Sequence, residues 1–139
     1  MLNQAIIDNF ISSENELLVD DNSEYRMVID KSTIKPVTLT LENGEKKAVV
    51  EGVIYVFYTK PYQPYSLLHE VKPYSINKYF TYVSVEDNTS ASTNFSFYNE
   101  KLELVDSDNQ TLKQTDFREI RPNSIGDTQF KILKENAYN

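Results

Sequence analysis

Cysteine and tryptophan are absent from this 139-residue chain, and histidine occurs once. Without cysteine the chain can form no disulfide, thiolate nucleophile or cysteine-ligated zinc site. The single histidine, His69, excludes the histidine pairs of zinc hydrolases, and Glu70 beside it would point to the opposite face of a strand. Three isolated glycines, Gly44, Gly52 and Gly126, form no glycine-rich loop that could hold phosphates. We therefore expect no enzyme activity, and no catalytic residue is assigned.

Metal and membrane signals are also missing. Residues 106–110 begin like a calcium loop, but Thr111 and Phe117 stand where an EF-hand needs Gly and Glu, so the pattern fails. The acidic turn at 20–24 is interpreted as solvated, and we expect no metal and no cofactor. No run approaches the roughly 20 apolar residues of a membrane-spanning helix. Residues 1–10 contain no Lys or Arg, so we expect no secretory signal peptide and no membrane partner.

Acidic residues outnumber basic ones, 21 to 14, which gives a net charge of −7. A length of 139 residues fits a single domain, residues 1–139. Residues 1–24 carry six acids and no base, and we describe them as an acidic N-terminal arm. Leu2, Ile6 and Phe10 recur every four residues there, which predicts a short helix. Because so short a helix is unstable alone, these three residues should dock on the same domain or on a neighbouring chain.

Residues 25–139 have the pattern of a β body. Apolar residues alternate from 37 to 41, and Asn43-Gly44 then predicts a tight hairpin, because both residues tolerate positive φ. The return strand, 46–58, should carry a bulge or bend at Gly52 and is apolar on both faces from 53 to 58.

The rest of this body continues the pattern. A second hairpin is predicted around Asn99-Glu100, and a turn at 106–110. A further strand is expected at 112–120. The C-terminal segment fits a strand or a helix, and we favour the strand. About seven or eight strands and a short N-terminal helix indicate a mainly β fold, an antiparallel β-sandwich or barrel.

The chain has 10 tyrosines and 7 phenylalanines, and nine of these aromatic residues lie between residues 55 and 82. The same segment contains only one acid, Glu70. Tyrosine combines a large apolar ring with a polar tip and is enriched at protein interfaces. One interpretation is therefore a partner-binding surface; the other is that these rings belong to core strands and that codon bias of an AT-rich genome supplied the rest. The acidic arm and this acid-poor segment could also join copies head to tail, as a homo-oligomer. The candidate partner-binding residues are Tyr58, Lys60, Tyr62, Tyr65 and Tyr74.

A small, cysteine-free, β-rich chain with the Asn43-Gly44 hairpin and the strand 53–58 resembles the minor virion proteins of tailed bacteriophages. That resemblance implies a structural protein of a neck, tail or baseplate, located in the virion or in the cytoplasm of a bacterial host. The alternative is a soluble inhibitor or immunity-type protein that binds a partner enzyme. Binding of single-stranded nucleic acid is a weaker hypothesis, because the net charge of −7 opposes phosphate binding.

Overall fold

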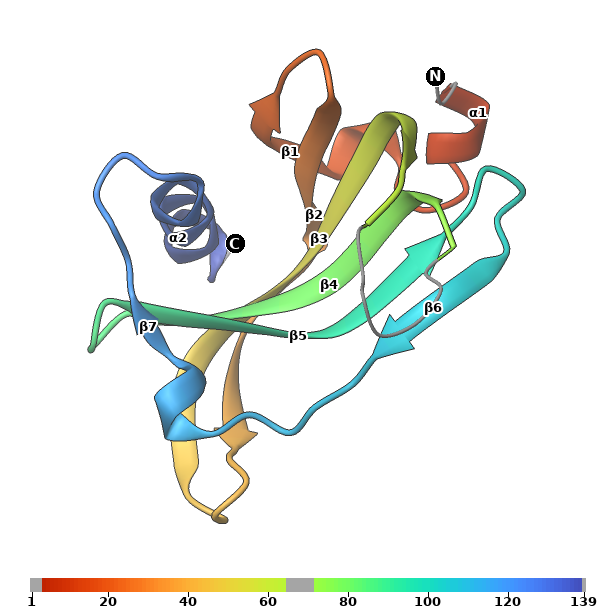
Figure 1. Cartoon of the computed structure of the whole chain (residues 1–139). Helices are drawn as coiled ribbons and strands as arrows, with labels where there is room; N and C mark the ends of the chain where they lie inside the picture. The colour runs from red at the N-terminus through yellow and green to blue at the C-terminus, as the bar shows by residue number, and fades with distance from the viewer. Residues whose placement is uncertain (1–3, 65–71, 139) are drawn as a thin grey trace.

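The computed structural model describes residues 4–64 and 72–138, which form one antiparallel sheet with an α-helix on each face (Figure 1). The sheet is a simple meander in which each strand from β1 to β6 lies beside the next, while β7 pairs with the start of β5. The elements are α1 (Gln4–Ile7), η1 (Ser13–Asn15), β1 (Glu16–Asp21), β2 (Tyr25–Thr40), β3 (Lys46–Tyr62), β4 (Tyr74–Ser84), β5 (Thr89–Tyr98), β6 (Leu104–Asp108), η2 (Gln114–Asp116), β7 (Arg118–Glu119) and α2 (Ile125–Asn136).

The expected mainly β, antiparallel fold with a short N-terminal helix is confirmed, and its sheet is a curled half-barrel. The Asn43-Gly44 hairpin joins β2 to β3. Gly44 has a φ of 87° there, and the N–H of Glu45 donates to the Asn43 side chain at 3.0 Å. The second hairpin, β5 to β6, is present as well.

Gly52 lies opposite an irregularity in the pairing of β2 with β3. Asp30 pairs with Val53 and Lys35 with Glu51, so the extra residues of this bulge belong to β2 and not to the glycine's own strand. Gly52 itself allows a close approach, because a Cβ at this position would overlap the side chain of Leu133 in α2.

Alternating residues of the central strands supply two separate cores. Ile29, Ile54 and Val56 face α2 and pack with Phe130 and Leu133. Because side chains alternate along a strand, the intervening residues point to the other face. There Val28, Val53, Tyr55, Phe57 and Ile76 pack with Ile7 and Ile11 of the α1 segment. The expectation that strand 53–58 is covered on both faces is therefore confirmed.

Two predictions for the C-terminal quarter are wrong. The segment 112–120 is mostly irregular, because the Lys113 N–H donates to the Asp116 carboxylate at 2.8 Å and closes a turn. Its apolar residues Leu112 and Phe117 instead cover a third core cluster at one end of the sheet. The last segment is the helix α2, not a strand. Its first turn is capped at Ser124, whose Oγ accepts from the Asp127 N–H at 3.1 Å.

The acidic arm and the turn at 106–110 also need correction. Most of the second half of the arm, Glu16–Asp21, is strand β1, which pairs with β2 through residues 16–18 and 20–21 and has a bulge at Val19. Residues 104–108 form β6 and pair with β5, so the turn begins later than expected. Polar side chains at these positions misled the prediction because edge strands tolerate charge.

Three buried tyrosines predict that the fold loses stability at alkaline pH. Burial raises the pKa of Tyr55, Tyr79 and Tyr82 to about 12, from an ordinary value of 10.0. The unfolded chain releases these protons first, so their contribution to stability is complete below pH 10 and is lost as the pH rises through about 12. We expect the denaturant midpoint, followed by circular dichroism, to fall over this range.

The control separates buried from exposed phenols. Tyr82→Phe removes one of the three groups and should make the alkaline decline shallower. Tyr138→Phe alters a ring that is 87% exposed and should leave the decline as it is in the wild type. A midpoint that stays constant up to pH 12 would show that these hydroxyls are not buried as the structure places them.

Candidate functional site

Seven aromatic rings form a continuous cluster across β2, β3, β4 and β5. We call this set the aromatic cluster. Neighbouring rings lie 4.6 to 6.4 Å apart between centroids, mostly in tilted or edge-to-face arrangements that favour ring–ring attraction. The cluster borders the core beneath α2, where the Gln129 amide donates to the Tyr79 hydroxyl at 3.3 Å. Its members are Tyr25, Tyr58, Tyr62, Tyr74, Tyr79, Phe95 and Phe97.

Strand pairing explains how the tyrosines meet. Tyr25 and Tyr58 are cross-strand partners in β2 and β3, and Tyr62 and Tyr74 are partners in β3 and β4. The register of β3 against β4 shifts between Phe57 and Tyr62, so the end of β3 leaves regular pairing there. Ring centroids of Tyr58 and Tyr62 consequently lie only 5.3 Å apart.

A groove of about 690 Å³ lies at the exposed end of this cluster. Tyr62 is its most accessible ring, with 47% of its surface exposed. We call this feature the aromatic groove. It is lined by Ser23, Glu24, Tyr25, Tyr58, Thr59, Lys60, Pro61, Tyr62, Gln63 and Tyr74.

The turn between β1 and β2 forms one wall of the groove and is tied directly to β3. The N–H of Thr59 donates to the Glu24 carbonyl at 2.9 Å, and its hydroxyl donates to the Ser23 carbonyl at 2.9 Å. The Tyr25 hydroxyl donates to Asp20 at 2.6 Å, which raises the pKa of that hydroxyl. The acidic arm and the tyrosine-rich segment therefore meet within one chain, and the head-to-tail contact between copies stays a prediction.

Burial also keeps the inner tyrosines protonated. It raises the pKa of Tyr58 and of Tyr74, and the proximity of their phenols adds to the shift of Tyr74. The Tyr58 and Tyr74 rings lie 5.8 Å apart between centroids in an edge-to-face arrangement. A phenol with the ordinary pKa of 10.0 is already neutral at pH 7, so this shift only widens the alkaline range in which Tyr58 and Tyr74 stay neutral.

The structure brings four of the five candidate partner-binding residues into this groove: Tyr58, Lys60, Tyr62 and Tyr74. Tyr65 lies outside the described residues, as does His69. Sequence reasoning missed Glu24 and Tyr25, which approach from β2 and its preceding turn. One sequence feature could have drawn attention to Glu24 and Tyr25: they lie where the acidic arm ends, just before the apolar run 27–29.

The candidate docking residues of the N-terminal helix lie against the chain's own sheet. Ile6 and Phe10 pack on the face opposite α2, and the Phe10 ring is 5.1 Å from that of Tyr98. Leu2 is outside the described residues. The sequence left open whether these residues dock on the same domain or on a neighbouring chain. The structure shows Ile6 and Phe10 packed on their own domain.

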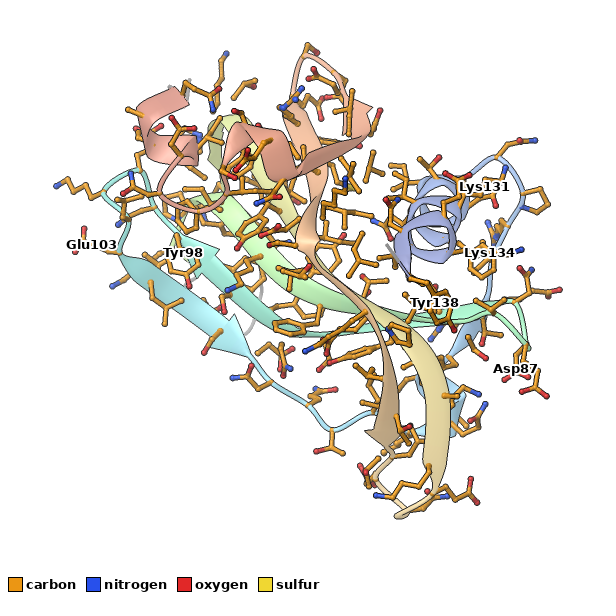
Figure 2. The ribbon with its side chains drawn as sticks, turned by 180° about the vertical axis from the view of Figure 1, so that it is seen from behind. Asp87, Tyr98, Glu103, Lys131, Lys134 and Tyr138 are labelled. Carbon is orange, nitrogen blue, oxygen red and sulfur yellow. The ribbon has the colours of Figure 1, made fainter. Side chains whose placement is uncertain are left out.

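Other parts of the described chain are weaker candidates for a functional site. A hollow of about 750 Å³ beside the β2–β3 hairpin is polar, and its Glu42 and Lys113 side chains already lie 3.9 Å apart. In residues 4–64 and 72–138, no group of three or more His, Cys, Asp or Glu is arranged to hold a metal ion. None of the helices described is long and apolar enough to cross a membrane. Figure 2 shows Glu103, in the turn between β5 and β6, on the side of the molecule opposite to Lys131 and Lys134 of α2.

The edge strands β1 and β6 carry acidic charge only, whereas the two-residue edge strand β7 carries one arginine and one glutamate. Strand β1 contains three acids and β6 contains two, and neither contains Lys or Arg. In β6 the Ser107 N–H is occupied by the Asp106 carboxylate at 2.8 Å. Like charges on β1 and β6 oppose the pairing of one sheet with another, which protects exposed apolar residues such as Leu104 from strand addition.

Removing charge from the β6 edge should therefore promote self-association. We expect Asp106→Ser with Asp108→Ser to raise the apparent mass in light scattering and to give aggregates at high concentration. The matched control, Glu45→Ser with Glu86→Ser, makes the same change in net charge at two turns and should stay at the wild-type mass. Equal behaviour of the two variants would mean that total charge, and not edge charge, controls association.

Comparison with protein-family models, with curated proteins and with solved structures finds no match for this chain.

Proposed function

We propose that this chain is a non-enzymatic assembly or binding protein that acts through protein–protein contacts at the aromatic groove. The observation that carries the proposal is the convergence of four tyrosines on one groove whose rim also holds Pro61 and two charged residues. Tyrosine-rich patches of this kind bury large rigid rings at little entropic cost and offer hydroxyls at their edges. The expected location in the neck, tail or baseplate of a tailed bacteriophage stays a prediction.

Binding as an inhibitor or immunity-type protein is the second candidate. The net charge of −7 and the acidic edges favour it, because both suit a basic target protein. The mass of the protein in solution separates the two: a stable oligomer supports an assembly role, and a monomer that forms a complex with one enzyme supports inhibition.

Site-directed photo-crosslinking tests the groove itself. A photoreactive phenylalanine replaces Tyr62 in one sample and Tyr138, an exposed tyrosine outside the groove, in the control. In extracts of the producing cells we expect a discrete protein adduct, with this chain or with another protein, from position 62 only. Excess unlabelled wild-type protein should compete for the adduct, whereas excess Tyr62→Ala should not.

Two outcomes would contradict the proposal. One is the absence of any adduct at position 62. The other is the same set of adducts from positions 62 and 138, which would indicate nonspecific contact. Because Tyr62 is 47% exposed, we expect the Tyr62→Ala competitor to melt like the wild type, and a thermal scan confirms that it is folded.

A further inference from the structure

The aromatic groove contains one carboxylate and one ammonium group that have no charged partner in the described part of the chain. Glu24 and Lys60 both line the groove and both are exposed, and neither side chain forms an ion pair or hydrogen bond with the residues described. Nearby charges are already used: Arg26 contacts Asp21 at 3.1 Å and Glu16 at 3.4 Å. Within the part of the chain that the structure describes, the groove therefore presents one unpaired positive and one unpaired negative group among its lining residues.

Their backbones are fixed relative to each other. The Glu24 carbonyl accepts from the N–H of Thr59 at 2.9 Å, so Lys60 is the next residue along β3 from a direct contact of Glu24. A patch that holds adjacent opposite charges is complementary to itself. When two copies meet across a two-fold axis, residue i of one contacts residue j of the other, and j contacts i. Both charges are then satisfied at once.

We propose that a second copy of this chain occupies the aromatic groove, in a symmetric dimer in which Glu24 of each copy pairs with Lys60 of the other. The exposed Tyr62 rings lie between these pairs and supply the apolar contact. This inference rests on the function proposed above and names the partner of that same groove.

The charges elsewhere on the molecule favour this contact over other modes of self-association. The edge strands β1 and β6 contain acids and no Lys or Arg, and the chain as a whole carries −7, so pairing of these strands between copies is opposed. In the groove, by contrast, Lys60 of one copy can face Glu24 of the other. A standard interface uses roughly 20–30 residues on each side, and the groove has ten, so we expect a weak dimer with Kd on the order of tens of micromolar.

Charge reversal tests the pairing with four proteins: wild type, Glu24→Lys, Lys60→Glu and the double variant. Analytical ultracentrifugation of the full chain gives Kd for each. We expect each single reversal to weaken the dimer at least about tenfold, because it breaks two symmetric pairs and places like charges together. The double variant should return to the wild-type Kd, since both pairs form again with opposite polarity.

A mixture of the two single variants provides a second, independent readout. One surface then carries only cations and the other only carboxylates, so we expect a heterodimer that is tighter than the self-association of either variant. Glu45→Lys is the matched control, because it makes the same change in charge at the tip of the β2–β3 hairpin, outside the groove, and should leave the pairing in place. All these side chains are exposed, and unchanged melting curves would show that each variant is folded.

Three results would overturn the inference. A wild type that remains monomeric up to about 1 mM, well above the expected Kd, excludes the dimer. A dimer with the same Kd in all four proteins places the contact on another surface. A Tyr62 crosslink to a foreign protein from a monomeric chain makes that protein the occupant and leaves the proposed function intact. Absence of any adduct at position 62 is the separate result that removes the proposed function as well.

Discussion

Val56→Asp is expected to unfold the protein. Val56 is 3% exposed in the middle of β3 and packs among Ile29, Ile54 and Leu133 beneath α2. An aspartate there would place an unpaired carboxylate in an apolar core, a change expected to cost roughly 4–5 kcal/mol or more. Because single domains of this size are stable by only about 5–15 kcal/mol, this loss approaches the total. Circular dichroism and a thermal scan should show no cooperative transition.

The matched control is Val56→Ala, which removes two methyl groups without adding charge. We expect it to remain folded and to lose about 2 kcal/mol, in line with the deletion of a small buried side chain. If Val56→Asp melted cooperatively near the wild-type temperature, the position of β3 between the two cores would be wrong.

Leu133→Ala is expected to have the second-largest effect, a loss of roughly 3 kcal/mol. Leu133 is completely buried and fills the space that Gly52 leaves open above β3. Truncation creates a cavity that a rigid sheet cannot close, and such deletions cost about 2–5 kcal/mol. Chemical denaturation measures this loss in the free energy of unfolding, with the same m-value (the dependence of that free energy on denaturant concentration) used for both proteins.

Gly52→Ala gives the matching half of a double-mutant cycle. Alone it should destabilise the fold by roughly 1–3 kcal/mol, because the new methyl group overlaps the Leu133 side chain. In the Leu133→Ala background the space is free, so the same change should be neutral or stabilising, and the coupling should be on the order of 1 kcal/mol or more. Additive losses would show that α2 does not sit on β3 at this glycine.

The sequence predicted those parts of the fold in which local chemistry and tertiary structure agree. Gly44 sets the turn through its positive φ and Asn43 through its side-chain hydrogen bond, and the run 53–58 is apolar toward both faces, so each signal is local. A short N-terminal helix also followed from the spacing of apolar residues, although α1 ends at Ile7 and Phe10 lies in the turn after it. In each case one short segment contained the whole signal.

The C-terminal helix was missed because its apolar residues fit two periods. Phe130 and Ile132 alternate like a strand, while Phe130, Leu133 and Ala137 follow a helix, and burial now shows that the helical set faces the core. A discriminating signal was present before these apolar residues: Ser124 followed by Asp127 is the start of a capped helix. The capping signal at Ser124 should therefore count for more than the short strand-like alternation of Phe130 and Ile132.

The candidate site could be predicted in part only. Tyrosine density and the scarcity of acids between residues 55 and 82 identified most of the groove, because those residues share β3, β4 and the loop between them. Glu24 and Tyr25 come from the other side of β3, and their place depends on the β2–β3 register, which begins at the distant hairpin. Sequence spacing carries no information on that pairing.

The most direct test of the account measures the affinity of this chain for the partner that crosslinks to position 62, whether a second copy or another protein. Titration calorimetry compares the wild type with Tyr62→Ala and with Tyr138→Ala, the exposed tyrosine outside the groove. We predict that Tyr62→Ala weakens binding by about tenfold or more, while Tyr138→Ala binds like the wild type. Equal affinity of all three proteins would show that the groove is not the surface through which this chain acts.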